Sequence, residues 1–206
     1  MENVEVMIEG KKFTYEEFLN LSKEEKNGHE IKIGKDCILG LHTKLVLMLK
    51  GKDCIYEFGN NVHVKSGYML INGVGNTIKI GEGTEIEEAL FFSNEYKNII
   101  IGSNCLISFR VTLRTSDIHT IFDKKTKQRT NQAGEVIIKD KVWIGPDTAV
   151  LKGVTIERGN IIGMKSVVTK SILEQDCIYA GTPAKKVKDN ILWDKRMLNE
   201  FPMDLI

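Results

Sequence analysis

The stretch IKDKVWIGPDTAVLKGVTIERGNIIGMKSVVTKSI, residues 138–172, decides the fold, because aliphatic residues recur in it every six positions. The recurring residues are Ile138, Ile144, Val150, Ile156, Ile162 and Val168. A helix repeats its apolar residues at spacings of three and four, and a single strand repeats them at every second residue, so a period of six matches neither element alone. It predicts a coil of short strands, in which three hexads complete one triangular turn.

The positions between these aliphatic residues fit the same coil. Four positions after each of them the chain carries mostly small or β-branched residues: Val142, Thr148, Val154, Asn160, Ser166 and Ile172. Gly145 and Gly163 directly follow two of the aliphatic residues, where the backbone would turn a corner. Stacked rungs bury a continuous core and pair their backbones in parallel, which one rung cannot do alone. The alternative is an antiparallel sandwich, and six consecutive hexads in one register disfavour it.

The same register appears earlier in the chain, so we expect the coil to cover residues 31–187. Its earlier members are Ile33, Leu39, Leu45, Ile80, Ile86, Ile101, Ile107 and Leu113. The register slips after Leu113, and the polar stretch that follows predicts a loop at about residues 114–135. A long loop inside a regular scaffold is usually functional or disordered. A second excursion is expected at about Ser66–Asn76, which contains three glycines.

The two ends of the chain lack the repeat and are expected to cap the coil, because the open ends of a solenoid expose unpaired backbone. Residues 1–30 predict a short strand followed by a helix that runs to about Lys26. Thr14 and Glu17 have the spacing of a capping box at the start of that helix. Residues 188–206 predict a C-terminal helix.

Composition excludes several classes of protein. The 206 residues carry a formal net charge of +1, which gives no electrostatic ground for binding nucleic acid or a membrane surface. No apolar run approaches the length of a membrane span, and the start of the chain lacks the apolar core of a signal peptide, so the cytoplasm is the expected compartment. The four cysteines are far apart, which disfavours a zinc site or a disulfide framework: Cys37, Cys54, Cys105 and Cys177.

Three short segments carry a resemblance to a known family. They are WIG at 143–145, IGMKSVVTK at 162–170 and AGTPAKKV at 180–187. With the hexad register, they make residues 31–190 resemble the hexapeptide-repeat acyltransferases. The pairing of His119 with Trp143 resembles in particular the capsule and polysialic acid O-acetyltransferases of that family. The resemblance implies an all-β fold, a left-handed parallel β-helix, and a homotrimer that binds acetyl-CoA in grooves between neighbouring coils. The left hand is implied by the resemblance alone, since the periodicity does not reveal it.

His119, in the string TSDIHT at the base of the predicted loop, is the candidate general base. An imidazole can take a proton from a sugar hydroxyl as that oxygen attacks a thioester. A carboxylate on the other ring nitrogen would orient the imidazole, and Asp117 and Asp123 are both near enough in sequence to do so. The resemblance implies the catalytic role of His119 and places Trp143 beside it.

The resemblance also implies a set of residues that bind acetyl-CoA. Those along the pantetheine arm would be Gly145, Gly163, Met164, Thr169 and Lys170, and those at the nucleotide would be Lys185 and Lys188. Phosphate groups call for such cations and for accessible backbone donors. The chain departs from the family at Met164-Lys165, where alanine-glycine is common.

A local excess of positive charge surrounds the predicted loop and would suit an acceptor that bears carboxylates or phosphates. Its members are Arg110, Arg114, Lys124, Lys125, Lys127 and Arg129. Aromatic residues that could stack on sugars are Phe91, Phe92, Tyr96 and Phe122.

The function that the resemblance implies is the transfer of acetyl from acetyl-CoA to a sugar hydroxyl. We expect the acceptor to be an acidic surface polysaccharide, such as a capsule or a sialic-acid-containing glycan, and the transfer to be direct in a ternary complex. No serine or cysteine has the setting of a covalent nucleophile. One alternative is a small acceptor such as a free sugar, serine or an antibiotic. A zinc hydratase of the carbonic anhydrase type needs three converging histidines, whereas His29, His42, His63 and His119 contain no close pair, so no metal is expected. A coil that serves as a non-catalytic scaffold is the remaining alternative.

Overall fold

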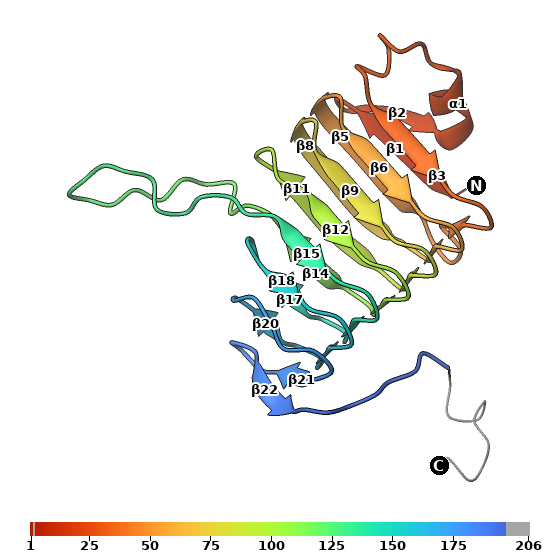
Figure 1. The fold of residues 1–206 in the computed structure, drawn as a ribbon. Coiled ribbons are helices and arrows are strands. Elements are labelled where there is room, and N and C mark those ends of the chain that lie inside the picture. Colours follow the sequence, from red (N-terminus) through yellow and green to blue (C-terminus); the bar gives the residue numbers. More distant parts are fainter. Residues whose placement is uncertain (2, 197–206) are drawn as a thin grey trace.

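The protein is a three-sided parallel β-solenoid in a computed structural model that describes residues 1 and 3–196 (Figure 1). Face A contains, in spatial order, β2 (Lys11–Thr14), β1 (Val4–Ile8), β5 (Leu45–Lys52), β8 (Gly67–Val74), β11 (Ala89–Asn94), β14 (Val111–Arg114), β17 (Ala149–Val150) and β20 (Val167–Val168). Face B contains β18 (Thr155–Ile156), β15 (Val136–Ile138), β12 (Ile99–Ile101), β9 (Thr77–Ile80), β6 (Ile55–Phe58) and β3 (Glu30–Ile33). Face C contains β22 (Lys185–Lys188), β21 (Ile178–Ala180), β19 (Ile161–Ile162), β16 (Trp143–Ile144), β13 (Leu106–Ile107), β10 (Glu85–Ile86), β7 (His63–Val64) and β4 (Ile38–Leu39).

The six-residue period places one aliphatic side chain of each short strand in the core. Ile144 pairs with Ile162 on the next rung and Val150 pairs with Val168, and all four are at most 1% exposed. The positions four residues further on are buried as well, including the polar Asn160. Among the described strands, only the β1–β2 and β21–β22 pairs are antiparallel, so the sandwich alternative is wrong.

The glycines at the corner from face B to face C are required by the stacking of the rungs. A Cβ atom on Gly102 would lie 2.6 Å from the backbone nitrogen of Asp140 on the next rung. Two residues later the chain turns through a positive φ, as at Asn104 with φ 56°. Asparagine and glycine tolerate this left-handed conformation best, which explains why the corner sequences look alike.

The excursion predicted at Ser66–Asn76 is wrong, because the stretch forms β8, which pairs in parallel with β5 and β11. Gly67 pairs with Ala89, twenty-two residues further on, whereas Ala149 pairs with Val167, eighteen residues further on. The extra residues lengthen the strands of face A in the N-terminal rungs. These extra residues shift the six-residue register of the sequence, although they remain part of the sheet.

The N-terminal cap contains the helix α1 (Tyr15–Asn20), which is shorter than predicted. Thr14 and Glu17 form the expected capping box, in which each side chain accepts from the other residue's backbone N–H. The helix ends because Leu21 is extended and because Ser22 and Glu25 make a second reciprocal cap, which starts a separate turn. No helix among the described residues is long and apolar enough to cross a membrane.

The predicted C-terminal helix is wrong for residues 190–196, which contain only bends, and the rest of it lies outside the described residues. Residues 189–196, here called the C-terminal strap, instead run from β22 back toward the N-terminal rungs (Figure 1), where Trp193 bonds to Lys141 and Lys195 to Glu85. The backbone N–H of Ile191 donates to Asp176 O at 2.9 Å, and Lys195 Nζ lies 2.7 Å from Glu85 Oε1. These contacts with the coil replace the backbone hydrogen bonds that a local helix would make.

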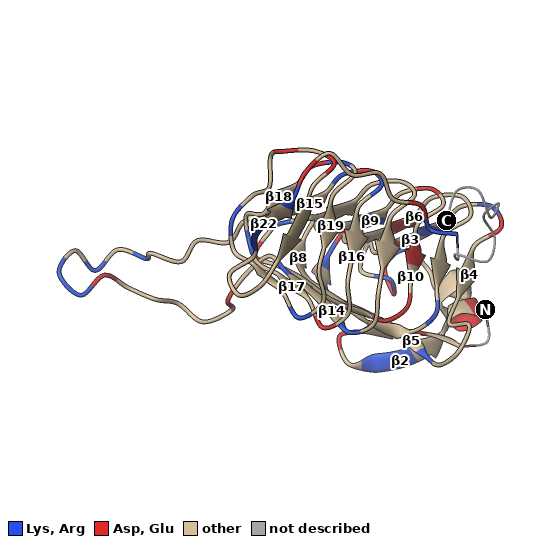
Figure 2. Cartoon of the chain, turned by 90° about the horizontal axis from the view of Figure 1, so that it is seen from below, with Lys and Arg blue, Asp and Glu red and all other residues tan. Residues whose placement is uncertain are grey.

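The polar stretch at residues 115–135 leaves the coil between β14 and β15 and is here called the arm (Figures 1 and 2). Its two sides pair with each other in the manner of a hairpin. Thr130 N donates to Ile121 O at 2.8 Å, and Asp123 N donates to Gln128 O at 2.9 Å. The arm therefore projects from the corner between faces A and B, and hydrogen bonds between its two sides fix its backbone.

Candidate active site

His119 lies at the base of the arm with an exposed side chain. Its backbone is held on both sides: His119 N donates to Asp117 O at 2.7 Å, and His119 O accepts from Asn131 Nδ2 at 2.8 Å. Among the described residues, no hydrogen bond engages the imidazole itself. The local structure thus fixes the Cα position of His119 and leaves both ring nitrogens available to a bound molecule.

Asn131 is the hub of the arm base, and the sequence did not single it out. It is 8% exposed, and its Nδ2 donates to Asp117 Oδ2 and to His119 O, both at 2.8 Å. Its Oδ1 accepts from Ile121 N at 2.8 Å. One side chain therefore joins the outgoing and returning sides of the arm. An asparagine in a polar loop gives no signal by which sequence alone could assign it this place.

Asp117 and Asp123, the carboxylates predicted to orient His119, form hydrogen bonds with other residues of the chain. Asp117 forms an ion pair with Lys152, and this hydrogen bond, followed by that from Asn131, lowers the pKa of the Asp117 carboxyl. Asp123 lies toward the tip of the arm, where its Oδ1 accepts from Thr126 N at 2.7 Å and Lys125 N at 2.9 Å. The bond from Thr126 chiefly lowers the pKa of Asp123. Both carboxylates organise the arm, and among the described residues no hydrogen bond joins either of them to the imidazole, so a carboxylate that orients His119 stays a prediction.

A second ion pair anchors the arm to the preceding rung. Arg129 donates from its two terminal nitrogens to the two oxygens of Glu95, at 2.6 and 2.9 Å, and Ser116 Oγ donates to the same carboxylate. Arg129 chiefly lowers the pKa of Glu95, and Glu95 raises the pKa of Arg129. Arg129 was predicted to recognise the acceptor, whereas here its charge is already paired.

A pocket beside the arm base is lined by residues on either side of His119. The lining residues are Asn72, Gly73, Asn94, Glu95, Tyr96, Ile118, Thr120 and Arg129. Tyr96 is 71% exposed and is the aromatic residue of this pocket that could stack on a sugar. Of the other aromatic candidates, Phe91 is buried in the core, Phe92 packs on face A against Tyr68, and Phe122 is exposed on the arm.

Trp143 lies on face C, in β16, with a half-buried side chain. Its Nε1 donates to Ser108 Oγ at 3.4 Å, and its ring centroid is 6.0 Å from that of Trp193. In a three-sided coil, face C lies opposite the corner between faces A and B, from which the arm departs. The prediction that His119 and Trp143 lie side by side is therefore wrong for a single chain.

The predicted acetyl-CoA residues fall at three places. Gly145, Gly163 and Met164 occupy the corner from face C to face A, Thr169 and Lys170 follow β20 on the same corner as the arm, and Lys185 and Lys188 bound β22. Gly145 is buried, and a Cβ atom there would lie 2.7 Å from the backbone nitrogen of Met164. Close packing of the next rung explains this glycine without a ligand. The other assignments stay predictions.

The predicted basic cluster is also divided among different places. Arg110 sits on the corner from face C to face A and forms a bidentate ion pair with Asp147, at 2.6 and 2.9 Å. The Arg114 guanidinium lies over the Phe92 ring on face A, 5.0 Å from its centroid. Exposed lysines gather at the tip of the arm (Figure 2): Lys124, Lys125 and Lys127. These residues do not form one continuous anion site.

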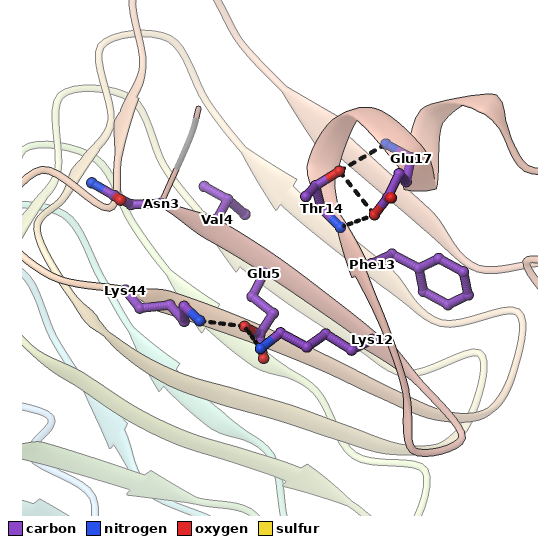
Figure 3. Close-up of a pocket in the computed structure, with 8 residues that line it drawn as sticks. All are labelled: Asn3, Val4, Glu5, Lys12, Phe13, Thr14, Glu17 and Lys44. Atoms are coloured by element: carbon purple, nitrogen blue, oxygen red, sulfur yellow. Dashed lines mark hydrogen bonds and ion pairs between the residues drawn. The ribbon is translucent and has the colours of Figure 1, made fainter.

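Another pocket lies at the N-terminal end of face A (Figure 3). Its charged centre is Glu5, whose Oε2 contacts Lys44 Nζ at 2.5 Å and Lys12 Nζ at 2.7 Å. The two lysines satisfy this carboxylate, and the pocket is remote from the arm. No group of three or more potential metal ligands occurs in the described part of the chain.

Comparison with known proteins identifies the family. Residues 135–170 match the model described as bacterial transferase hexapeptide (six repeats). The chain is 30% identical over 180 residues to the galactoside O-acetyltransferase of Escherichia coli strain K12, covering 77% of this chain and 85% of that protein. The chain belongs to the hexapeptide-repeat transferase family. The solenoid is accordingly the left-handed parallel β-helix of the acyltransferases in this family.

Two further proteins similar to this chain are named polysialic acid O-acetyltransferases. The polysialic acid O-acetyltransferase of Escherichia coli O1:K1 / APEC is 36% identical over 119 residues, which are 58% of this chain. The matched part spans 38% of the length of that relative. The crystal structure of the polysialic acid O-acetyltransferase OatWY superposes with a TM-score of 0.69 at 26% identity, covering 86% of this chain and 92% of that one.

Proposed function

We propose that this protein is an acetyl-CoA-dependent O-acetyltransferase that acetylates a sugar hydroxyl of an acidic surface polysaccharide. The observation that carries the proposal is the exposed imidazole of His119, whose backbone is fixed at a corner of a hexapeptide coil. The named activities of the relatives, galactoside and polysialic acid O-acetylation, support the reaction class.

The proposed reaction is direct transfer between two bound substrates. His119 accepts the proton of the acceptor hydroxyl, and the oxygen forms a bond to the acetyl carbonyl carbon. The carbon–sulfur bond breaks, and the CoA thiolate that leaves takes up the proton from the imidazolium. Backbone N–H groups near the coil corner would stabilise the transient oxyanion. Holding both substrates together converts a bimolecular step into an intramolecular one, which supplies much of the acceleration.

We propose that the active site forms between two copies of the chain in a homotrimer, since His119 and Trp143 lie on opposite sides of one coil. The outward side chains of face A are apolar and half-buried, which suits contact with another copy: Val46, Met48, Tyr68, Leu70, Leu90 and Phe92. Face B instead exposes ion pairs such as Glu57–Lys79. Ile118, Ile121 and Phe122 on the arm are each more than half exposed, so a neighbouring surface would remove apolar area from water.

The lysines at the arm tip support an acidic polymer as the acceptor. Among the described residues, Lys124, Lys125 and Lys127 take part in no ion pair, and their charges project away from the coil where a long chain could reach them (Figure 2). The pocket that contains Tyr96 instead favours a small sugar as the second candidate acceptor. The cytoplasmic location expected from the sequence stays a prediction.

A panel of acceptors with radiolabelled acetyl-CoA tests this function. We expect label on acidic polysaccharides such as polysialic acid, and a fall in kcat of about 100-fold for His119→Ala, the usual contribution of a general base. His42→Ala is the matched control, because His42 is exposed and remote from the arm. Labelling of monosaccharides alone would overturn the polymer acceptor. A His119→Ala variant with full activity would overturn the role of the imidazole.

A further inference from the structure

The sequence contains two tryptophans, Trp143 and Trp193, and the fold brings them together from distant positions. Their ring centroids are 6.0 Å apart, and the ring planes are inclined by 45°. This distance and tilt lie in the range that aromatic pairs prefer. Trp143 belongs to the coil, whereas Trp193 arrives on the C-terminal strap. Both side chains are half-buried, so the pair borders solvent on face C.

Three contacts along the strap hold Trp193 in place. Trp193 Nε1 donates to Lys141 O at 2.9 Å, Ile191 N donates to Asp176 O at 2.9 Å, and Lys195 Nζ lies 2.7 Å from Glu85 Oε1. The strap thereby crosses from β21 to β10, about 19 Å at the usual strand spacing of about 4.8 Å. Four extended residues cover only about 13 Å, and the lysine side chain spans the rest. The strap therefore reaches across four strand spacings of face C with the help of the Lys195 and Glu85 side chains.

Trp143 lacks a comparable anchor of its own. Among the described residues, its side chain makes one hydrogen bond, from Nε1 to Ser108 Oγ, which is 3.4 Å long and at the weak end of the range for such bonds. Ile144, the next residue of β16, points into the core, whereas the Trp143 side chain lies on the outer side of face C and is half-buried. Contact with Trp193 therefore limits the orientations that the Trp143 indole can take.

We propose that Trp193 is a positioning residue of the acetyl-transfer site, which holds the indole of Trp143 at the orientation used there. The proposal rests on the proposed function, because Trp143 matters only if that site operates. Trp193 acts through Trp143 and through no contact with the reacting atoms. Changes that separate the Trp193 ring from Trp143 are therefore expected to lower turnover, whereas changes to exposed strap side chains that do not contact Trp143 are not.

A double-mutant cycle tests the proposal. Trp193→Ala should lower kcat about tenfold, less than the roughly 100-fold that a 1 Å misplacement of reacting groups can cost. In a Trp143→Ala background the same substitution should have no further effect. Trp193→Phe, which keeps an aromatic ring, should recover most of the lost turnover. An equal fall in kcat in both backgrounds would overturn the proposal, because Trp193 would then act independently of Trp143.

A neighbouring residue and a spectroscopic measurement separate positioning from folding. Leu192 is 93% exposed on the same strap, so Leu192→Ala is the matched control and should leave kcat unchanged. Each of the variants Trp143→Phe and Trp193→Phe keeps one tryptophan. The near-ultraviolet circular dichroism spectrum of the wild type should differ from the sum of their two spectra, because neighbouring indoles couple. A purely additive spectrum would refute the contact even if the protein transferred no acetyl group. Absence of acetyl transfer with a coupled spectrum would refute the proposed function instead.

Discussion

At the scale of single residues, two ionised carboxylates hold the base of the arm in place through ion pairs. Asp117 is paired with Lys152 and bonded to Asn131, and Glu95 is paired with Arg129. In both cases the ion pair lowers the pKa of the carboxyl group. A carboxyl with a lowered folded-state pKa stabilises the structure above its unfolded pKa, and it loses that effect as the pH falls through the folded value.

The order of the arm should therefore depend on acidity through Asp117. We expect hydrogen exchange at the Ile121 and Thr130 amides, corrected for its intrinsic pH dependence, to be slower in the wild type than in Asp117→Asn at neutral pH. The difference should shrink below about pH 4, the ordinary pKa range of an aspartate. Asp140→Asn, which alters a carboxylate on another corner, serves as the control. Equal protection in wild type and Asp117→Asn at every pH would contradict this account.

Residue identities in the sequence predicted the arm and its histidine but not the partners that fix them. His119 stands out because it sits where the hexad register stops. The positions of Asn131, Lys152 and Glu95 follow no sequence motif. These residues come close to their partners on the arm only when the rungs stack. The assignment of Asp117 to the imidazole followed sequence proximity, whereas Lys152, thirty-five residues away, lies close in space and carries the opposite charge.

At the scale of elements, short-range periodicity predicted the rungs well, because each hexad encodes one strand and one corner. It failed where the contacts are long-range. The stretch at 190–196 has helix-forming residues, yet Trp193 and Lys195 bond to rungs more than fifty residues away. The glycines at Ser66–Asn76 suggested a loop, although Gly67 is packed against the backbone of Ala89 within the sheet.

The arm is also the element at which acceptor charge can be tested. Replacing Lys124, Lys125 and Lys127 together with glutamine should raise KM for an acidic polymer about tenfold and leave KM for a neutral monosaccharide within about twofold, because the lysines attract charge without touching the reacting atoms. The effect should diminish at high salt. A control triple variant at Lys23, Lys35 and Lys139, all exposed elsewhere, should behave as the wild type. A similar rise in KM for both acceptors would contradict attraction by charge.

At the scale of the whole molecule, the triangular cross-section determines which residues can meet. His119 leaves the corner between faces A and B, and Trp143 lies on face C across the coil. No local adjustment of one chain brings these side chains together. Sequence reasoning could not foresee this separation, since a spacing of twenty-four residues fixes neither the face nor the corner. A closed ring of identical chains would bring the arm of each copy to a different surface of its neighbour.

Complementation between two inactive variants tests this claim most directly. His119→Ala and Trp143→Ala should each retain only a small but measurable fraction of wild-type activity alone. After they are unfolded together in equal amounts and refolded, random assembly should restore about a quarter of wild-type activity, because each site then draws its imidazole and its indole from different chains of a closed ring. Native mass spectrometry would verify that mixed trimers form. Mixed trimers without activity would contradict an active site shared between chains.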